Sequence, residues 1–207
     1  MNSDYIQGCY AIIAQIAKAK PGLEFNQLDE DVREGLIADH REFLAEMNDW
    51  WDFQIDDWKE KQAELGFPDA KITFSLSYSQ GDHAAFECKR VDVYKFITAH
   101  HLGHKYRSLL NIINNGWTVD MSVNCGRGGY TTVEGETDYR TDIVERENRV
   151  AEQIYSLAAT IRAEVEDYGK QIYRELQTEW EYISSDKAIS EYLQDCYYFT
   201  PDGAYID

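Results

Sequence analysis

A short polar segment, residues 77–83, brings together hydroxyl, amide, carboxylate and imidazole groups. Asp82 could orient His83, and Ser79 could then act as a nucleophile or as a hydrogen-bond donor to a phosphate. The same residues also suit a turn, in which Gly81 supplies a positive φ and the polar side chains satisfy backbone groups. Because the sequence offers no GxSxG elbow and no second catalytic segment, the turn is favoured over catalysis. For binding, both interpretations stay open, and the predicted binding loop is Ser79, Gln80, Gly81, Asp82 and His83.

A second group of reactive side chains is the histidine cluster at residues 100–104. On a helix, His100 and His104 would share one face and could hold one metal ion. The glutamate of an HExxH motif is missing, however, and Gly103 weakens a helix at this point. We therefore predict no metal site and no cofactor, and His100 and His104 are the candidate ligands if a metal is bound.

Acidic residues dominate two parts of the chain, whose formal net charge is −18. Residues 29–64 hold 13 acidic and 4 basic residues, and residues 134–191 hold 15 acidic and 7 basic residues. Such a surface repels nucleic acid and anionic membranes and attracts basic proteins. Mimicry of nucleic acid and an ordinary solvated helix face both stay open. The residues predicted to form this acidic face are Glu42, Glu46, Asp49, Asp52, Asp56, Asp57, Glu60, Glu164, Glu166 and Asp167.

The hydrophobic pattern changes twice along the chain and predicts an α+β fold. Residues 1–66 are helical, with a break near Ala38 or Asp49, and a long apolar stripe between residues 139 and 196 is helical again. Between them, the β-rich residues 70–136 contain two hairpins, which predict a small antiparallel sheet of about four strands, and residues 93–114 between the hairpins favour one helix or two short ones. Gly126–Gly129 lies between two predicted strands, so it indicates a hairpin turn and not a phosphate loop. Because no linker divides the chain, we expect one domain over residues 1–207.

The remaining composition points to a cytoplasmic protein. No apolar stretch approaches the length of a membrane span, and the first residues lack the basic start of a secretory signal. Cys9, Cys88, Cys125 and Cys196 stand singly, which favours reduced and mostly buried thiols over a zinc or redox motif.

The hairpin segment Phe74–Phe86 reads FSLSYSQGDHAAF, and its pattern FSxxxSQGDxAxF resembles a family of uncharacterised proteins of tailed phages and prophages. Some members of that family are labelled as toxin–antitoxin components. Trp50–Asp52 and the C-terminal segment Tyr173–Asp186 fit the same family. The family usually has a glycine at the position of His83. The resemblance implies a phage or mobile-element origin and a role in host takeover or defence evasion, and it implies no reaction.

These observations lead to three hypotheses from different classes. The first is a non-enzymatic phage protein that inhibits a host nuclease, defence complex or toxin with a basic surface, through its acidic helices. The second is a small enzyme or ligand-binding domain that uses the loop from Ser79 to His83. The third is a virion structural or assembly protein, which would form a homo-oligomer. The first predicts a partner that binds less tightly as salt is added.

Overall fold

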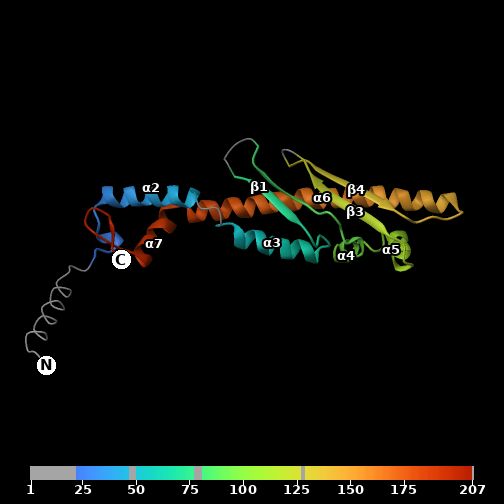
Figure 1. The fold of residues 1–207 in the computed structure, drawn as a ribbon, viewed down its shortest axis with the longest axis horizontal. Coiled ribbons are helices and arrows are strands. Elements are labelled where there is room, and N and C mark those ends of the chain that lie inside the picture. Colours follow the sequence, from blue (N-terminus) through green and yellow to red (C-terminus); the bar gives the residue numbers. More distant parts are fainter. Residues whose placement is uncertain (1–21, 47–49, 77–80, 127–128, 207) are drawn as a thin grey trace, which may run out of the picture. The chain divides into compact units, whose positions relative to one another are not determined.

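The protein is described from a computed structural model that covers residues 22–46, 50–76, 81–126 and 129–206 (Figure 1). Its contacts divide the chain into two compact units. The larger unit spans Asp49–Trp180, and the smaller unit combines Met1–Asn48 with Glu181–Asp207. The expectation of a single domain stays a prediction, and each unit is described by itself.

The larger unit combines helices with two β-hairpins, as the alternating hydrophobic pattern predicts. Its elements are α3 (Asp52–Glu64), β1 (Lys71–Ser75), β2 (His83–Glu87), α4 (Val93–Ala99), α5 (Arg107–Asn114), β3 (Val119–Cys125), β4 (Thr131–Thr137) and α6 (Val144–Ile183). The fold class α+β is therefore confirmed at this level. Helix α2 (Glu30–Glu46) precedes α3, and the predicted break near Asp49 falls on residues outside the described part of the chain.

The expectation of one four-stranded sheet is wrong, because each hairpin forms its own two-stranded antiparallel sheet. One isolated bridge joins them, in which Cys88 and Val123 exchange backbone hydrogen bonds of 3.0 and 2.8 Å. The chain then bends at Lys89 and Arg90, and Asp92 caps α4 by accepting a hydrogen bond from the Lys95 N–H. Because the chain turns into a helix there, the bridge does not extend into a ladder.

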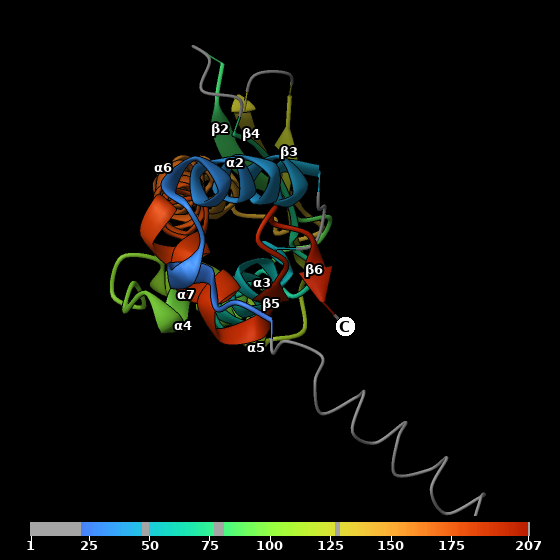
Figure 2. The ribbon, with the colours of Figure 1, turned by 90° about the vertical axis from the view of Figure 1, so that its left-hand side faces the viewer.

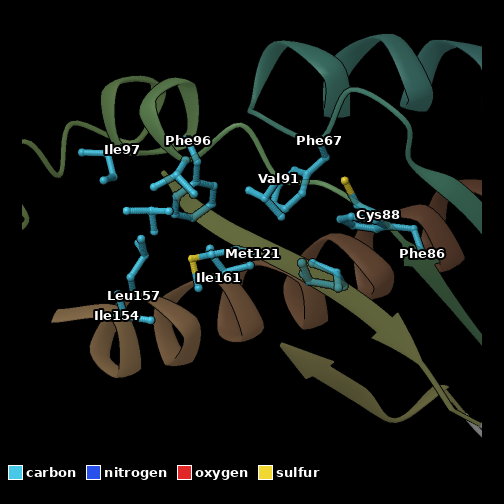
Figure 3. Packing of buried hydrophobic residues seen from close by; sticks show 14 of the residues in the cluster. Phe67, Phe86, Cys88, Val91, Phe96, Ile97, Met121, Ile154, Leu157 and Ile161 are labelled. Atoms are coloured by element: carbon cyan, nitrogen blue, oxygen red, sulfur yellow. The ribbon is translucent and has the colours of Figure 1, made fainter. Parts of the chain in front are cut away.

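The core of the larger unit lies between α6 and the strands. Along α6 the side chains of Leu157, Ile161 and Ile172 are fully buried, at the helical spacing that the sequence predicts. Figure 3 shows Leu157 and Ile161 beside Met121 of β3, with Phe96 of α4 also directed into the cluster. The long helix is thus the element against which the hairpins pack.

The four cysteines follow the predicted burial only in part. Cys88 is buried, and its thiol donates a hydrogen bond of 2.9 Å to the Asp69 carboxylate. Burial, followed by the contact with Asp69, raises the pKa of Cys88 to about 12. Cys125 is half-buried and Cys196 is exposed, and Cys9 lies outside the described residues.

The smaller unit contains η1 (Phe25–Gln27), α2 (Glu30–Glu46), α7 (Asp186–Cys196) and the short strands β5 (Tyr198–Phe199) and β6 (Tyr205–Ile206). Figure 2 shows α2, α7 and the β5–β6 pair together. The Ser185 hydroxyl caps α7 by accepting the Ala188 N–H at 3.2 Å. In the described part of the smaller unit, the buried core residues are Phe25, Leu28, Leu36, Ile189, Leu193 and Phe199.

Every helix in the described part of the chain is either too short or too polar to cross a lipid bilayer.

Candidate ligand-binding site

The end of the β1–β2 hairpin positions the described residues of the predicted binding loop. Ser75 pairs with His83 as the last residues of the ladder, and the loop members Ser79 and Gln80 lie outside the described residues. The Asp82 carboxylate, which was expected to orient His83, accepts a hydrogen bond of 3.1 Å from the Ser75 hydroxyl. The His83 ring is held by the Gly81 carbonyl, which lies 2.7 Å from Nδ1 and can only accept. The Nδ1 atom therefore carries the proton.

Two glycines allow other elements to approach this end of the hairpin closely. At Gly169 of α6, a Cβ atom would lie 2.5 Å from the Ala84 carbonyl oxygen, so only glycine lets the helix touch the backbone of β2. Gly129 has a φ of +76° and lies under the His83 ring, where a Cβ atom would come within 2.5 Å of Cδ2. The positive φ fits the predicted hairpin turn, of which Arg127 and Gly128 are outside the described residues.

These approaches leave a cavity of about 480 Å³ between the hairpin ends and α6. Its polar lining includes Asp82 and His83 from the hairpin, Thr131 from β4, and side chains from successive turns of α6. The α6 residues that line it include Glu166, Lys170, Tyr173, Arg174 and Gln177. The cavity volume is in the range of sites for small molecules.

The cavity lining contains two carboxylates, Asp82 and Glu166, and two cations, Lys170 and Arg174. Glu166 accepts a hydrogen bond of 2.8 Å from Arg162, whose guanidinium also lies 5.0 Å from the centre of the Tyr130 ring. By contrast, neither Lys170 nor Arg174 forms an ion pair with any residue in the described part of the chain. The two side chains are four residues apart on one helix, so they can reach the same group. Two available cations beside a polar wall can hold a carboxylate or a phosphate.

The described residues of the predicted acidic face are distributed over three helices, α2 (Glu30–Glu46), α3 and α6. Asp52, Asp56, Asp57 and Glu60 are exposed on α3, where Asp56 pairs with Lys59 at 2.8 Å and Asp57 pairs with Lys61 at 2.7 Å. Glu42 lies on α2 of the smaller unit, Asp49 is outside the described residues, and so is the side chain of Glu46.

The three predicted acidic residues of α6 have different neighbours. Glu166 lines the cavity, whereas Glu164 and Asp167 lie near Tyr168. Burial, followed by the negative charges of Glu164 and Asp167, raises the pKa of Tyr168 to about 12.

The histidine pair does not have the geometry of a metal site. Helix α4 ends at Ala99, so His100 and His104 are not one turn apart on one helix. The Nδ1 atom of His100 lies 2.9 Å from the Phe96 carbonyl, and Nε2 lies 2.9 Å from the Tyr168 hydroxyl. Both ring nitrogens are therefore used within the fold. Among the described residues, no group of three or more His, Cys, Asp or Glu side chains is placed to hold a metal ion.

Sequence reasoning missed the basic half of the site. Lys170 and Arg174 lie within residues 134–191, whose net charge is negative, so the net charge of that segment gave no sign of them. Their spacing of four residues, beside the apolar stripe of one predicted helix, was the signal that could have found them.

Comparison with known proteins places the site within a recognised domain. Residues 50–186 match the family described as a domain of unknown function, DUF8835. The chain belongs to this family. No curated protein and no solved structure among those compared is similar to the chain. The DUF8835 match covers nearly all of the larger unit, so the cavity and every residue that lines it lie inside the family's domain.

Proposed function

We propose that the larger unit is a binding domain for a small acidic ligand, which it holds in the cavity between the end of β2 and α6. The observation that carries this proposal is the pair Lys170 and Arg174, which line the cavity without an ion-pair partner in the described chain. In a chain of net charge −18, two such cations at one cavity are a marked local exception.

The ligand's acidic group lies between Lys170 and Arg174, because a guanidinium and an ammonium one helical turn apart can bind the same carboxylate or phosphate. The remaining lining offers hydroxyl groups from Thr131 and Tyr173 and the His83 ring, which suit a ligand with further polar groups. We propose binding without turnover.

The test is a thermal-shift screen of the full chain against small carboxylic and phosphoric acids, at constant pH and ionic strength. A ligand that binds only the folded state stabilises it by RT ln(1 + L/Kd), where L is the free ligand concentration, so it raises the unfolding temperature as its concentration increases. We expect at least one acid to stabilise the wild-type chain and to have no effect on Lys170→Gln/Arg174→Gln.

A matched control is Lys59→Gln/Lys95→Gln, which makes the same change in net charge at exposed positions of α3 and α4. This control keeps the response to the acid if the cavity binds it. An acid that stabilises all three proteins equally, or no stabilising acid in the screen, would contradict the proposal.

A second candidate function is inhibition of a basic host protein by a phage-encoded chain, through the acidic surface of α3. The exposed side chains of Asp52, Asp56 and Glu60, within a chain of net charge −18, favour it. Its test is affinity capture from a bacterial lysate at low salt, followed by elution in salt steps. A specific basic partner should elute at moderate salt and should be lost with Asp52→Asn/Glu60→Gln. A partner retained equally at all salt concentrations would contradict this candidate.

A further inference from the structure

Strand β4 has an edge whose backbone groups point away from β3. In an antiparallel pair, the residues of successive opposite pairs direct their N–H and C=O groups alternately toward and away from the partner strand. On β3, the backbone of Val123 bonds to Cys88 and the Met121 carbonyl accepts from Val91, so both residues face β2. Their opposite residues on β4 are Val133 and Gly135, respectively, whose backbone groups must therefore face outward.

These outward groups have no partner in the described part of the chain. No hydrogen bond joins the backbone of Val133 or Gly135 to a residue beyond the β3–β4 ladder. Gly135 and its neighbours Glu134 and Glu136 are exposed. An open row of this kind is a ready template for one more strand.

The surface on each side of this edge is hollowed. On the side of β4 that carries Glu134 and Glu136, a cavity of about 630 Å³ extends across the hairpin to Asp120 and Arg90. On the side toward α6, a cavity of about 360 Å³ is lined by Gly135, Ile154 and Tyr155, among others. Side chains of an added strand alternate between the two faces of a sheet, so each would have a cavity to enter.

The negative charges near the outer edge of β4 determine which kind of added strand this edge favours. Asp120 lies directly opposite Glu136 in the ladder, and like charges in that position destabilise a sheet. The only ion pair of this group in the described chain is between Asp120 and Arg90, at 3.7 Å. A second copy of the same edge would bring Glu134 and Glu136 against their own counterparts. The charge therefore favours a basic occupant over a copy of this chain.

We propose that the outer edge of β4 binds an extended segment of a partner protein as an added strand. The segment carries Lys or Arg at alternate positions, beside Glu134 and Glu136, and apolar residues between them that face Ile154 and Tyr155. The main-chain hydrogen bonds to Val133 and Gly135 supply affinity, and the alternating side chains supply specificity. Charged side chains on an edge can also serve only to prevent aggregation, and the experiment distinguishes the two roles.

The probe is a fluorescently labelled peptide in which Lys alternates with Val, about seven residues long, the length of an ordinary strand. Its binding to the full chain is followed by fluorescence anisotropy at low salt. A second peptide has the same sequence with alternate backbone nitrogens methylated, which removes the donors needed for strand pairing. We expect the methylated peptide, and the chain with Glu134→Lys/Glu136→Lys, each to lose affinity by at least about tenfold.

The matched control is Glu60→Lys/Glu64→Lys on α3, which makes the same charge change on another exposed surface and should bind the probe nearly as wild type. Urea unfolding of both variants establishes that they are folded. Equal affinity for the methylated and unmethylated peptides would overturn the proposal, because it would show charge attraction without strand pairing. Absence of binding would also overturn it, as would concentration-dependent self-association that Glu134→Lys/Glu136→Lys abolishes.

Discussion

The two flanks of α6 use polar side chains in opposite ways. On the flank that meets α3, α4 and α5, polar groups bond to one another: the Trp58 Nε1–H donates to Glu175 at 2.7 Å, and Tyr168 reaches His100 at 2.9 Å. On the flank that meets β2, Lys170 and Arg174 line a cavity without an ion-pair partner in the described chain. The first arrangement fixes helices in place, and the second leaves charge available to a ligand. The difference separates residues that hold the fold from residues that bind.

The largest expected effect on stability comes from a substitution that forces α6 and β2 apart. Gly169→Ala puts a methyl group 2.5 Å from the Ala84 carbonyl, and we expect it to lower the free energy of unfolding by about 3 kcal/mol. Gly35→Ala is the matched control, since Gly35 lies within α2 with nothing within 4 Å of the added atom. It should raise stability by about 0.5–1 kcal/mol. Urea unfolding measures both, and equal effects would refute the close contact.

On the flank of α6 that meets α3, α4 and α5, removal of a hydrogen-bond acceptor should lower stability. Trp58 is buried, so Glu175→Ala leaves its indole N–H without a partner and should cost about 1–3 kcal/mol of unfolding free energy. Glu175→Gln keeps an acceptor oxygen and should cost clearly less. The comparison is made by urea unfolding at neutral pH. If the two variants were equally stable, the hydrogen bond would contribute nothing to this flank.

Two glutamines of α3, Gln54 and Gln62, are exceptions to the rule that buried polar groups are paired, and Gln62 is the more complete exception. Gln62 is completely buried, and neither its carboxamide oxygen nor its nitrogen has a partner within the described chain. Gln62→Met keeps the shape and removes the unpaired amide, so we expect the free energy of unfolding to rise by about 1 kcal/mol. Thermal unfolding measures the change. A fall in stability would mean that the carboxamide has a bonding partner in solution, such as a buried water.

The smallest effect is a dependence of stability on alkaline pH. The pKa of Tyr168 is raised to about 12 in the folded chain from an ordinary value of 10.0. The unfolded chain therefore loses this proton first, and the contribution of Tyr168 to stability is lost as pH rises from about 10 to about 12. Urea midpoints measured across this interval should fall less steeply for Tyr168→Phe than for wild type. Parallel curves would contradict the assigned shift.

The helices and strands of this fold can be predicted from the local pattern of apolar residues, whereas the cavity beside α6 cannot. Alternation at Ile72 and Phe74 predicts β1, and the apolar spacing from Val150 to Leu176 predicts α6. Periodicity identifies an apolar face without showing whether another element covers it. Phe43, for example, is an apolar residue of α2, within the segment predicted to be helical, but is 55% exposed. Whether two hairpins merge into one sheet likewise depends on the bend at Lys89 and Arg90, which no alternation encodes.

The cavity was beyond sequence reasoning because it depends on a contact between distant segments. Asp82 and His83 were predicted as binding residues from their own loop, and the structure places both in the cavity lining. The residues that complete it are brought there by Gly169 against Ala84, a pairing that neither local sequence shows. Glu166 was predicted to belong to the acidic face because of its charge. In the structure it pairs with Arg162 and lines the cavity.

The most direct test of the account measures affinity and stability together in one variant from each flank. With an acid from the screen, calorimetric titration of Arg174→Gln should show affinity reduced at least about tenfold, with the urea midpoint unchanged. Tyr168→Phe should lower the urea midpoint and leave the affinity unchanged, because it loses a hydrogen bond worth about 1 kcal/mol and touches no ligand. If Arg174→Gln instead lowered the urea midpoint and left affinity intact, the two flanks would not differ in function and the account would be wrong.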